Sequence, residues 1–269
     1  MSFFTAGEHR LPLNRTYIMG ILNVTPDSFS DGGKYSEADA ALNHALKMQE
    51  EGADIIDVGG QSTRPGYTAI SPKEEWERIE PVLRALLTKL RVPVSVDTFY
   101  PQVAEQALRM GAHIINDVSG FGDEMLKVAA GFDCGCVIMH PRGAQDKDIL
   151  AEVREFFVER VEAAERLGID RGRLCLDPGI GFGKSYEDNL RLIARVEETK
   201  LPGIAYLMAA SRKRVTGAPC GNPPFEQRLA STIAAHTAAV IRGADMVRVH
   251  DVKEAVQAAR MADALKPYL

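Results

Sequence analysis

Short apolar runs rich in β-branched residues recur along the chain and alternate with segments of helical period. The runs read TYIMGILN, ADIIDVGG, VPVSVDT, HIINDVS, CGCVIMH, LCLDPG, IAYLMAAS and ADMVRVH. Strands that are almost continuously apolar are typical of a parallel sheet that helices cover on both faces. Eight strand–helix units within 269 residues match the size and rhythm of an α/β protein of the (β/α)8 TIM-barrel class.

The segments between the runs carry helix signals. After Ser71, one helical face collects the apolar side chains Trp76, Ile79, Leu83, Leu86 and Leu90. Ser71 and Glu74 have the spacing of a capping box, with Pro72 at the first helical position. The stretches EGADIID, MGAHIIND and RGADMVRV share a glycine that is expected to end a helix before the next strand.

A doubly wound open sheet would explain the same alternation. The count of eight runs and the lack of an early G-x-G-x-x-G motif favour the closed barrel. No linker, charge block or low-complexity segment divides the chain, so we predict a single domain. Residues 1–15 precede the first strand and are expected to form an N-terminal cover segment over the barrel floor, while residues 16–269 form the barrel.

The charge balance and the cysteines restrict the class of partner. The net charge is −5 and the pI about 5.8, so no basic field attracts nucleic acid, and an anionic ligand must be held by local groups. No apolar run approaches the roughly 20 residues of a membrane span, and the stretch MSFFTAGEHR lacks the features of a signal peptide. We therefore expect a cytoplasmic protein without a membrane partner. The 4 cysteines lack the spacing of a zinc site and are expected to be buried, reduced thiols.

The stretch LDPGIGFGKS, residues 176–185, looks like a phosphate-binding loop because it ends in Gly-Lys-Ser. The opening glycine of that signature would stand at position 178, which is Pro178 and has no N–H for a phosphate. Asp177 at the end of the preceding strand would also repel a triphosphate. The stretch is therefore not predicted to bind a nucleotide.

Polar side chains follow nearly every apolar run where the predicted strand ends. They are Asn23, Gly59-Gly60-Gln61-Ser62-Thr63-Arg64, Asp97, Asn116, Met139-His140, Asp177, Ser211-Arg212-Lys213 and Arg248-Val249-His250. One such residue alone is more often a turn residue or a helix cap. The carboxyl ends of barrel strands meet at one mouth, where barrel enzymes build their active sites. The set as a whole therefore predicts an active site.

The deeper of two predicted subsites contains Asp97, Asn116, Asp177 and Lys213. The period-two alternation of a strand places Ser95 with Asp97, and Cys175 with Asp177, on the inward face. Buried carboxylates need hydrogen-bond donors. A flat heterocycle with adjacent ring N–H and amino groups, such as a pterin or guanine, supplies such donors, and the lysine can bind its carbonyl or ring nitrogen.

The second predicted subsite suits an anion and contains Asn23, Arg64, Arg248 and His250. Arginine binds phosphate in a bidentate way. Asn23 can offer its amide oxygen to a Mg²⁺ that already carries phosphate oxygens and water. The residues alone therefore predict an enzyme that holds a planar amino-heterocycle below and a phosphorylated group above.

The stretches MGILNVTPDSFSDGG, DVGGQSTRPG, SVDTF, INDVSG, DPGIGFGK, SRKR and RVHDV closely resemble those of the dihydropteroate synthase family of the folate pathway. The resemblance covers essentially the full chain. It implies a transferase that joins 4-aminobenzoate to 6-hydroxymethyl-7,8-dihydropterin diphosphate, with loss of diphosphate before the arylamine attacks. It also implies a Mg²⁺-dependent barrel that is usually a homodimer and a target of sulfonamides.

The resemblance assigns roles to individual residues. The pterin and diphosphate side comprises Thr63, Asp97, Asn116, Met139, Asp177, Phe182, Lys213, Arg248 and His250, with Asn23 at the metal. The 4-aminobenzoate side and its loops comprise Phe29, Asp31, Arg64, Pro65, Ser211 and Arg212. Loops 24–35 and 61–70 are expected to close over the site. Asp177 then becomes the working residue of LDPGIGFGKS, with Lys184 at the surface and Ser185 at a helix start.

Three positions depart from the usual family pattern. Gln61 stands where Glu is common, His140-Pro141-Arg142-Gly143 replaces the usual residues after the fifth strand, and Arg214 stands where Ser is frequent. These departures bear on rate and inhibitor sensitivity rather than on reaction type. His140 and the remaining histidines are expected to be structural.

Two alternative functions remain open at this point. A pterin-binding methyltransferase shares the barrel and the pterin pocket, but it would not need Ser211-Arg212-Lys213 or the pair Arg248 and His250. A non-catalytic paralogue would bind reduced pterin without condensing it, and it could lose Asn23 and Lys213, both of which are present.

Overall fold

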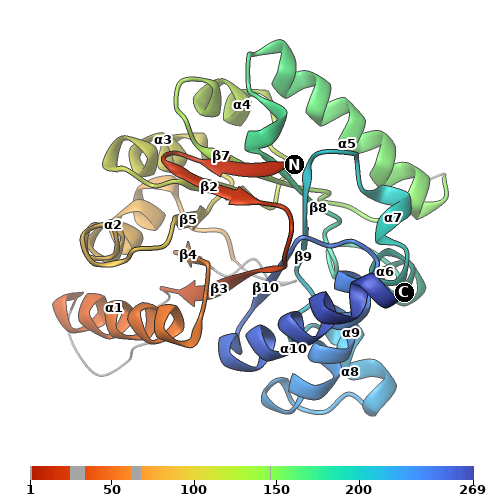
Figure 1. Ribbon diagram of the computed structural model, residues 1–269. Coiled ribbons are helices and arrows are strands. Elements are labelled where there is room, and N and C mark those ends of the chain that lie inside the picture. Colours follow the sequence, from red (N-terminus) through yellow and green to blue (C-terminus); the bar gives the residue numbers. More distant parts are fainter. Residues whose placement is uncertain (1, 25–33, 62–67, 146) are drawn as a thin grey trace.

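Eight parallel strands close into a barrel in the computed structural model, which describes residues 2–24, 34–61, 68–145 and 147–269 (Figure 1). The strands are β3 (Tyr17–Asn23), β4 (Ile55–Gly59), β5 (Val94–Asp97), β6 (Ile114–Asp117), β7 (Gly135–Met139), β8 (Leu174–Asp177), β9 (Ala205–Met208) and β10 (Met246–Val249). The ring closes where β10 pairs with β3, with Met246 opposite Tyr17. The predicted (β/α)8 barrel is therefore confirmed, and the open sheet is excluded.

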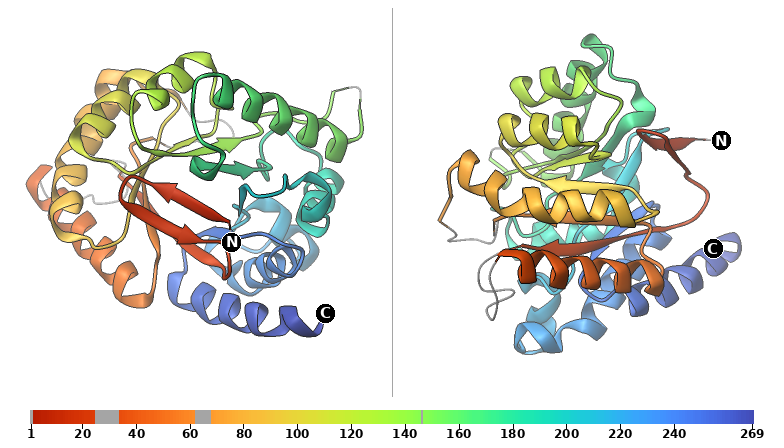
Figure 2. Two further views of the ribbon diagram at one scale, coloured as in Figure 1. Left: turned by 45° about the horizontal axis from the view of Figure 1, so that its top comes forward. Right: turned by 90° about the vertical axis from the view of Figure 1, so that its left-hand side faces the viewer.

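Helices surround the strands and form the outer layer (Figures 1 and 2). They are α1 (Lys34–Glu51), α2 (Pro72–Lys89), α3 (Pro101–Met110), α4 (Asp123–Ala130), α5 (Ile149–Arg166), α6 (Tyr186–Ala194), α7 (Val196–Thr199), α8 (Arg214–Gly217), α9 (Leu229–Ile241) and α10 (Val252–Leu265). Short 3-10 turns are η2 (Arg171–Arg173), η3 (Ala218–Cys220), η4 (Phe225–Gln227) and η5 (Lys266–Tyr268). Within the described ranges, each helix is too short or too polar to cross a lipid bilayer.

Local sequence signals set the helix ends. Ser71 Oγ accepts a hydrogen bond from the Glu74 backbone N–H at 3.2 Å, and Pro72 begins α2, as predicted. The Glu74 carboxylate completes no capping box but pairs with Arg78 at 2.6 Å. Gly111 closes α3 with a φ of 110°, a conformation that costs other residues steric strain.

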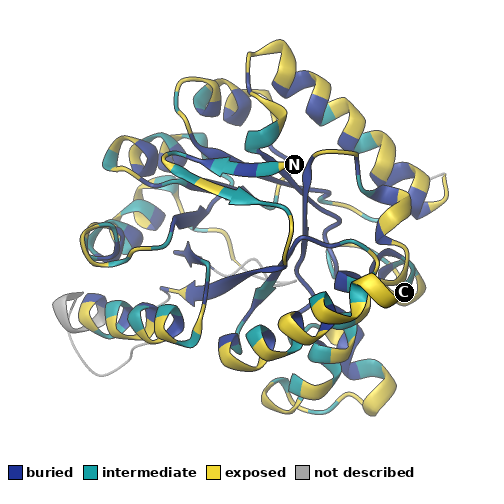
Figure 3. Cartoon of the chain, in the orientation of Figure 1, coloured by how far each residue is buried: buried dark blue, intermediate teal, exposed yellow. Residues whose placement is uncertain are grey.

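The barrel interior changes from apolar to polar along the strands. Figure 3 shows the barrel strands almost entirely buried, because their outward side chains pack under the helices. The inward side chains of the lower layer are Tyr17, Met19, Ile55, Ile114, Val137, Cys175, Ala205, Leu207 and Met246. Two residues further along several strands, the inward positions hold polar side chains. Period-two alternation therefore places the polar groups above an apolar base, at the carboxyl end.

A β-hairpin lies across the end of the barrel where the strands begin (Figure 2). Its strands β1 (Phe3–Ala6) and β2 (His9–Pro12) are antiparallel, with Phe4 opposite Leu11. Phe4 is fully buried and joins the apolar lower layer. Gly135 makes room for this ring, since a Cβ there would lie 2.6 Å from Phe4 Cζ. The division of the chain into residues 1–15 and 16–269 stays a prediction.

All of the cysteines are free thiols. Cys134, Cys136 and Cys175 are buried, as expected. The expectation is wrong for Cys220, which is exposed because it lies in the surface turn η3 immediately before Gly221.

Candidate active site

The strand ends that the sequence analysis singled out lie in register around the barrel mouth. Asn23 is opposite Gly59, Gly59 is opposite Asp97, and Asp97 is opposite Asn116. Met139 is likewise opposite Asp177. Asn23, Gly59, Asp97 and Asn116 thus lie at one level, whereas Asn116 is opposite Val137, so Met139 and Asp177 lie two residues further along their strands, towards the mouth.

Two carboxylates bind the Arg248 guanidinium inside the barrel, and an amide binds one of these carboxylates. Arg248 Nε donates to Asp57 Oδ2 at 2.6 Å, and Arg248 Nη2 donates to Asp97 Oδ2 at 2.8 Å. Asn116 Nδ2 donates to the same Asp57 Oδ2 at 3.0 Å. The strand-end pattern predicts Arg248 in the anion subsite. In the structure its hydrogen bonds join it to the deep group of Asp97 and Asn116.

Asp57 is a member of this group that the sequence analysis missed. Its side chain is 0% exposed, in the middle of the apolar run of β4. The signal was present, because Asp57 is a charged residue two positions after inward-facing Ile55 and before the strand end at Gly59. A carboxylate within a buried strand needs paired donors, and attention to strand ends alone overlooked it.

The carboxylates keep unused acceptor capacity. Oδ1 of Asp97 and Oδ1 of Asp57 are buried and accept no hydrogen bond from the described residues. Burial raises the pKa of Asp97 to about 7, against the lowering effect of the Arg248 charge. A buried acceptor without a donor costs about 1 to 3 kcal/mol. These oxygens therefore favour a ligand that brings N–H groups.

Asp177, Lys213 and Phe182 lie together beside this group. Asp177 is buried, and its Oδ1 accepts from the Gly179 backbone N–H at 2.7 Å. Lys213 Nζ donates to the Ile180 carbonyl at 2.6 Å and lies 4.8 Å from the centroid of the Phe182 ring. Burial lowers the pKa of Lys213 to about 8, and the charges of Asp177 and Asp97 oppose that shift. One ammonium is thus influenced by both carboxylates of the predicted deep subsite.

Lys184 is not the surface residue that we predicted. Its Nζ donates to the His140 carbonyl at 3.1 Å and to the Phe182 carbonyl at 3.3 Å, and burial lowers its pKa to about 7. Gly179 lies against the same carbonyl, since a Cβ there would be 2.1 Å from His140 O. The loop folds back onto the end of β7, which no sequence pattern indicated. Ser185 caps α6 in a full capping box, as expected.

A second cluster lies at the ends of β9 and β10. Ser211 Oγ is 2.9 Å from His250 Nδ1 and also accepts the His250 backbone N–H at 3.2 Å. Arg212 donates to the two oxygens of Asp251 at 2.9 and 2.5 Å. Ser211 and His250 therefore form one unit, whereas the guanidinium of Arg212 is bound to the loop that follows β10.

The remaining predicted residues divide into two groups. Met139 ends β7 and is buried, Phe182 is half-buried, and Asn23 ends β3 with an exposed side chain. Five further predicted residues lie outside the described residues, namely Phe29, Asp31, Thr63, Arg64 and Pro65.

The departures from the family pattern have specific contacts. Gln61 is buried, and its Nε2 donates to Glu75 Oε1 at 3.2 Å. Glu75 is also buried and accepts from Thr98 Oγ1 at 2.7 Å. The amide thus supplies a donor where a second carboxylate would be repelled. Arg142 pairs with Glu152 at 3.2 Å, and Arg214 begins α8 with an exposed side chain.

A group of possible metal ligands lies at the opposite end of the barrel. Glu8, His9 and His113 offer ligand atoms within 4.8 Å of one another. However, the Val94 backbone N–H donates to His113 Nδ1 at 3.1 Å, which leaves the ring proton on Nε2 and no lone pair there for a metal. Mg²⁺ prefers oxygen ligands, and the exposed amide of Asn23 at the mouth fits that preference better.

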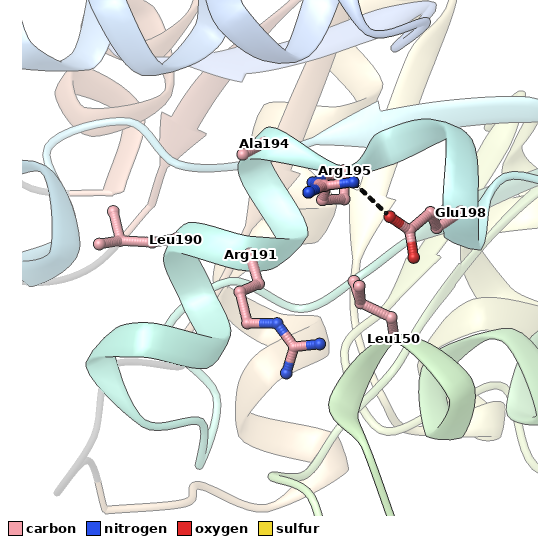
Figure 4. Close-up of a pocket in the computed structure, with 6 residues that line it drawn as sticks. All are labelled: Leu150, Leu190, Arg191, Ala194, Arg195 and Glu198. Atoms are coloured by element: carbon pink, nitrogen blue, oxygen red, sulfur yellow. Dashed lines mark hydrogen bonds and ion pairs between the residues drawn. The ribbon is translucent and has the colours of Figure 1, made fainter.

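A shallow groove of about 310 Å³ lies on the outer layer between α5 and α6–α7 (Figure 4). It is lined by Leu150, Leu190, Arg191, Ala194, Arg195 and Glu198. Arg195 pairs with Glu198 at 3.0 Å, and Arg191 pairs with Asp148. These ion pairs satisfy the charges that line the groove, so it does not compete with the barrel mouth as a reaction site.

Comparisons with known proteins identify one family. Residues 19–250 match the family described as pterin binding enzyme. The dihydropteroate synthase of Clostridium beijerinckii is 45% identical over 255 residues, which cover 93% of this chain and 94% of that protein. The Xanthomonas albilineans enzyme with indole-2-carboxylic acid and 6-chloroguanine is similar with a TM-score of 0.93, at 43% identity over 99% of each chain. Its complex with 7,8-dihydropteroate has a TM-score of 0.88, at 38% identity over 99% of each chain. This chain therefore belongs to the dihydropteroate synthase family of pterin-binding enzymes.

Proposed function

We propose that this chain is a dihydropteroate synthase. It joins 4-aminobenzoate to 6-hydroxymethyl-7,8-dihydropterin diphosphate and releases 7,8-dihydropteroate and diphosphate. The observation that carries the proposal is the pair of buried inward carboxylates, Asp97 and Asp177, whose charges both act on Lys213. The amino group and ring N–H groups of a pterin are the donors that such carboxylates need.

The deep subsite binds the pterin through complementary hydrogen bonds. Asp97 has a buried oxygen that accepts nothing from the described residues, and Asp177 has one oxygen bound to a single backbone N–H. Lys213 supplies a positive donor for the pterin carbonyl or a ring nitrogen. Phe182 and Met139 provide apolar surfaces beside the ring.

The reaction itself needs little acid–base chemistry from the protein. The bond between the pterin methylene carbon and the diphosphate oxygen breaks, and the electron pair leaves with that oxygen. The nitrogen of 4-aminobenzoate attacks the methylene carbon with its lone pair and loses a proton after the C–N bond has formed. The carboxylates of Asp97 and Asp177 stabilise the positive charge that develops on the pterin.

We assign the diphosphate to the outer mouth, beside His250 and Asn23. The Ser211 hydroxyl accepts a hydrogen bond from the His250 backbone N–H and can donate one to His250 Nδ1. This arrangement favours the tautomer with its proton on Nε2, and Nε2–H can donate a hydrogen bond to a phosphate oxygen. The amide oxygen of Asn23 would hold Mg²⁺ together with diphosphate oxygens and water. When bound, Mg²⁺ supplies positive charge that stabilises the departing diphosphate.

The 4-aminobenzoate side belongs to Ser211, Arg212 and loop residues. Asp251 holds the Arg212 guanidinium next to Ser211, so a carboxylate at the rim would lie beside a fixed group that has further N–H donors. Phe29, Asp31, Arg64 and Pro65 are part of the same proposal, with Thr63 on the diphosphate side. We further propose that the enzyme is cytoplasmic and that it is a homodimer. Light scattering of the purified protein tests the dimer through its molar mass.

Incubation of the protein with both substrates and Mg²⁺, with detection of 7,8-dihydropteroate by mass spectrometry, tests the function. We expect product and diphosphate in equal amounts. A non-catalytic paralogue would bind 6-hydroxymethyl-7,8-dihydropterin in a calorimeter but give no product. A methyltransferase would instead transfer a methyl group to a corrinoid, so each alternative has a result of its own.

A further inference from the structure

Asp57 has no direct role in the reaction described above, although it is among the most buried charged groups of the barrel. It lies on the inward face of β4, one layer above Ile55, with its side chain 0% exposed. Its Oδ2 accepts two hydrogen bonds, from Arg248 Nε at 2.6 Å and from Asn116 Nδ2 at 3.0 Å. Both donors belong to other strands, so one oxygen connects β4, β6 and β10.

The contact with Asp57 fixes which way the Asn116 amide faces. A guanidinium only donates hydrogen bonds, so the Asp57 Oδ2 that binds Arg248 Nε is an acceptor, and the NH₂ group of Asn116 must point to it. The carbonyl oxygen of Asn116 then points to the other side. Without Asp57, the amide could turn and present NH₂ there instead. Asp57 thus determines that Asn116 offers an acceptor to a heterocycle.

The second contact sets the position of the Arg248 guanidinium. With Nε on Asp57 and Nη2 on Asp97, the planar group is fixed at two of its edges. Without Asp57, Arg248 would be free to pair with Asp97 alone. The Asp97 oxygens would then be engaged by a guanidinium instead of a ligand, and the affinity for N–H donors would fall.

We propose that Asp57 is a positioning residue for pterin binding, which acts through the amide orientation of Asn116 and the placement of Arg248. The proposal rests on the proposed function for the identity of the ligand. The positioning role of Asp57 requires an acceptor oxygen at the place of its Oδ2 atom. A negative charge in the general region does not suffice.

Two substitutions separate these requirements. Asp57→Asn keeps an oxygen that can accept from both Arg248 and Asn116, whereas Asp57→Ala removes it. Hydrogen bonds to charged groups correspond to about 10- to 100-fold in a dissociation constant. We therefore expect Asp57→Ala to weaken binding of 6-hydroxymethyl-7,8-dihydropterin by about 10- to 100-fold, and Asp57→Asn to remain within about threefold of the unchanged protein.

Asp245 offers a matched control. It is a buried carboxylate that accepts from Lys200 Nζ at 2.7 Å and from the Tyr206 backbone N–H at 2.9 Å, but it precedes β10 at the barrel floor. Asp245→Ala is expected to lower stability in urea without changing the affinity for the pterin. Its comparison with Asp57→Ala separates a positional effect from general loss of stability.

The experiment is calorimetric titration of each full-length variant with 6-hydroxymethyl-7,8-dihydropterin. The KM for 4-aminobenzoate is a second readout, and it should stay within about threefold of the wild-type value in both Asp57 variants. Binding that is unchanged in Asp57→Ala, or equally weak in Asp57→Asn, overturns the proposal. If Asp57→Ala does not fold, Asp57→Ser gives the same test, because its hydroxyl is too short to bridge both donors. Titration measures binding without turnover. A wild-type protein that binds the pterin but makes no dihydropteroate would therefore refute the proposed function and leave the positioning role of Asp57 testable.

Discussion

At the scale of single residues, burial controls the charge of the barrel mouth. Burial raises the pKa of Asp97 to about 7, with further raising by Asp57 and opposition from Arg248. A protonated carboxyl has lost one acceptor site for the pterin N–H groups. The pterin affinity of the free protein is therefore expected to fall about tenfold per pH unit below about 7. Calorimetry from pH 5.5 to 8.5 measures this, and a flat profile would contradict it.

Asp177 leads to a second prediction at this scale. Asp177→Asn replaces one acceptor oxygen by an NH₂ group while keeping the side-chain shape, so a pterin donor would face another donor. We expect loss of detectable pterin binding with little change in the urea midpoint. Unchanged affinity by calorimetry would remove Asp177 from the site.

The buried pair of Gln61 and Glu75 provides a pH-dependent prediction. Burial raises the pKa of Glu75 above its usual 4.5, and Gln61→Glu would add a second carboxyl within hydrogen-bond distance. Both folded-state pKa values would then exceed the unfolded ones. The variant should match the wild type below pH about 4 and lose about 2 kcal/mol of stability as pH rises to 8.

Urea unfolding at pH 5 and at pH 8 measures this loss. Gln106→Glu on the exposed side of α3 is the matched control, because it adds the same charge in water. Equal stability of the two variants at pH 8 would show that the carboxylates at 61 and 75 do not interact.

At the scale of elements, the loop between β8 and α6 is fastened to the end of β7. Lys184 bonds the carbonyls of His140 and Phe182. Lys184→Met keeps the length of the side chain but removes both bonds, so Phe182 and the Ile180 carbonyl would lose their fixed position beside Lys213. We expect the KM for the pterin diphosphate to rise about five- to twentyfold, with a smaller change in the KM for 4-aminobenzoate.

Steady-state kinetics with each substrate varied in turn measure this difference. Lys127→Met on α4 is the control, because Lys127 is exposed and pairs with nearby Glu124 at 2.6 Å. A KM for the pterin diphosphate that is equal in both variants would contradict a positioning role of Lys184.

Sequence patterns predicted the elements more completely than the contacts between them. Apolar runs and helix caps act within a few residues of one another, so the strands, Ser71 and Ser185 were predicted from local sequence. Alternation also predicted that Asp97 and Asp177 face inward. In contrast, the bonds of Arg248 to Asp57 and of Lys184 to His140 join residues far apart in the chain. Their partners depend on barrel closure and loop packing, which no short window of sequence contains.

At the scale of the whole molecule, stability and chemistry are placed at opposite ends of the barrel. Phe4 fills the floor layer, whereas the polar groups lie at the mouth. Phe4→Ala would leave a cavity and is expected to cost about 3 to 5 kcal/mol of stability. Because the floor carries no reacting group, kcat and both KM values should stay within about twofold at temperatures where the variant is folded.

Thermal unfolding and kinetics on the same preparation check this separation. Phe3→Ala is the control, because Phe3 is only half-buried and stacks under Arg10. A large change in KM for Phe4→Ala would mean that the floor and the mouth are coupled.

Arg248 comes from the last barrel strand, 191 residues after Asp57 and 151 after Asp97. On the ribosome, both acidic groups therefore emerge well before the cation that neutralises them. Before β10 has been synthesised, the two acidic side chains face each other without Arg248. Their repulsion opposes early closure of the barrel around them. The cation reaches both acidic groups only when the final strand closes the ring, so a ligand in the mouth would favour the closed ring over open forms.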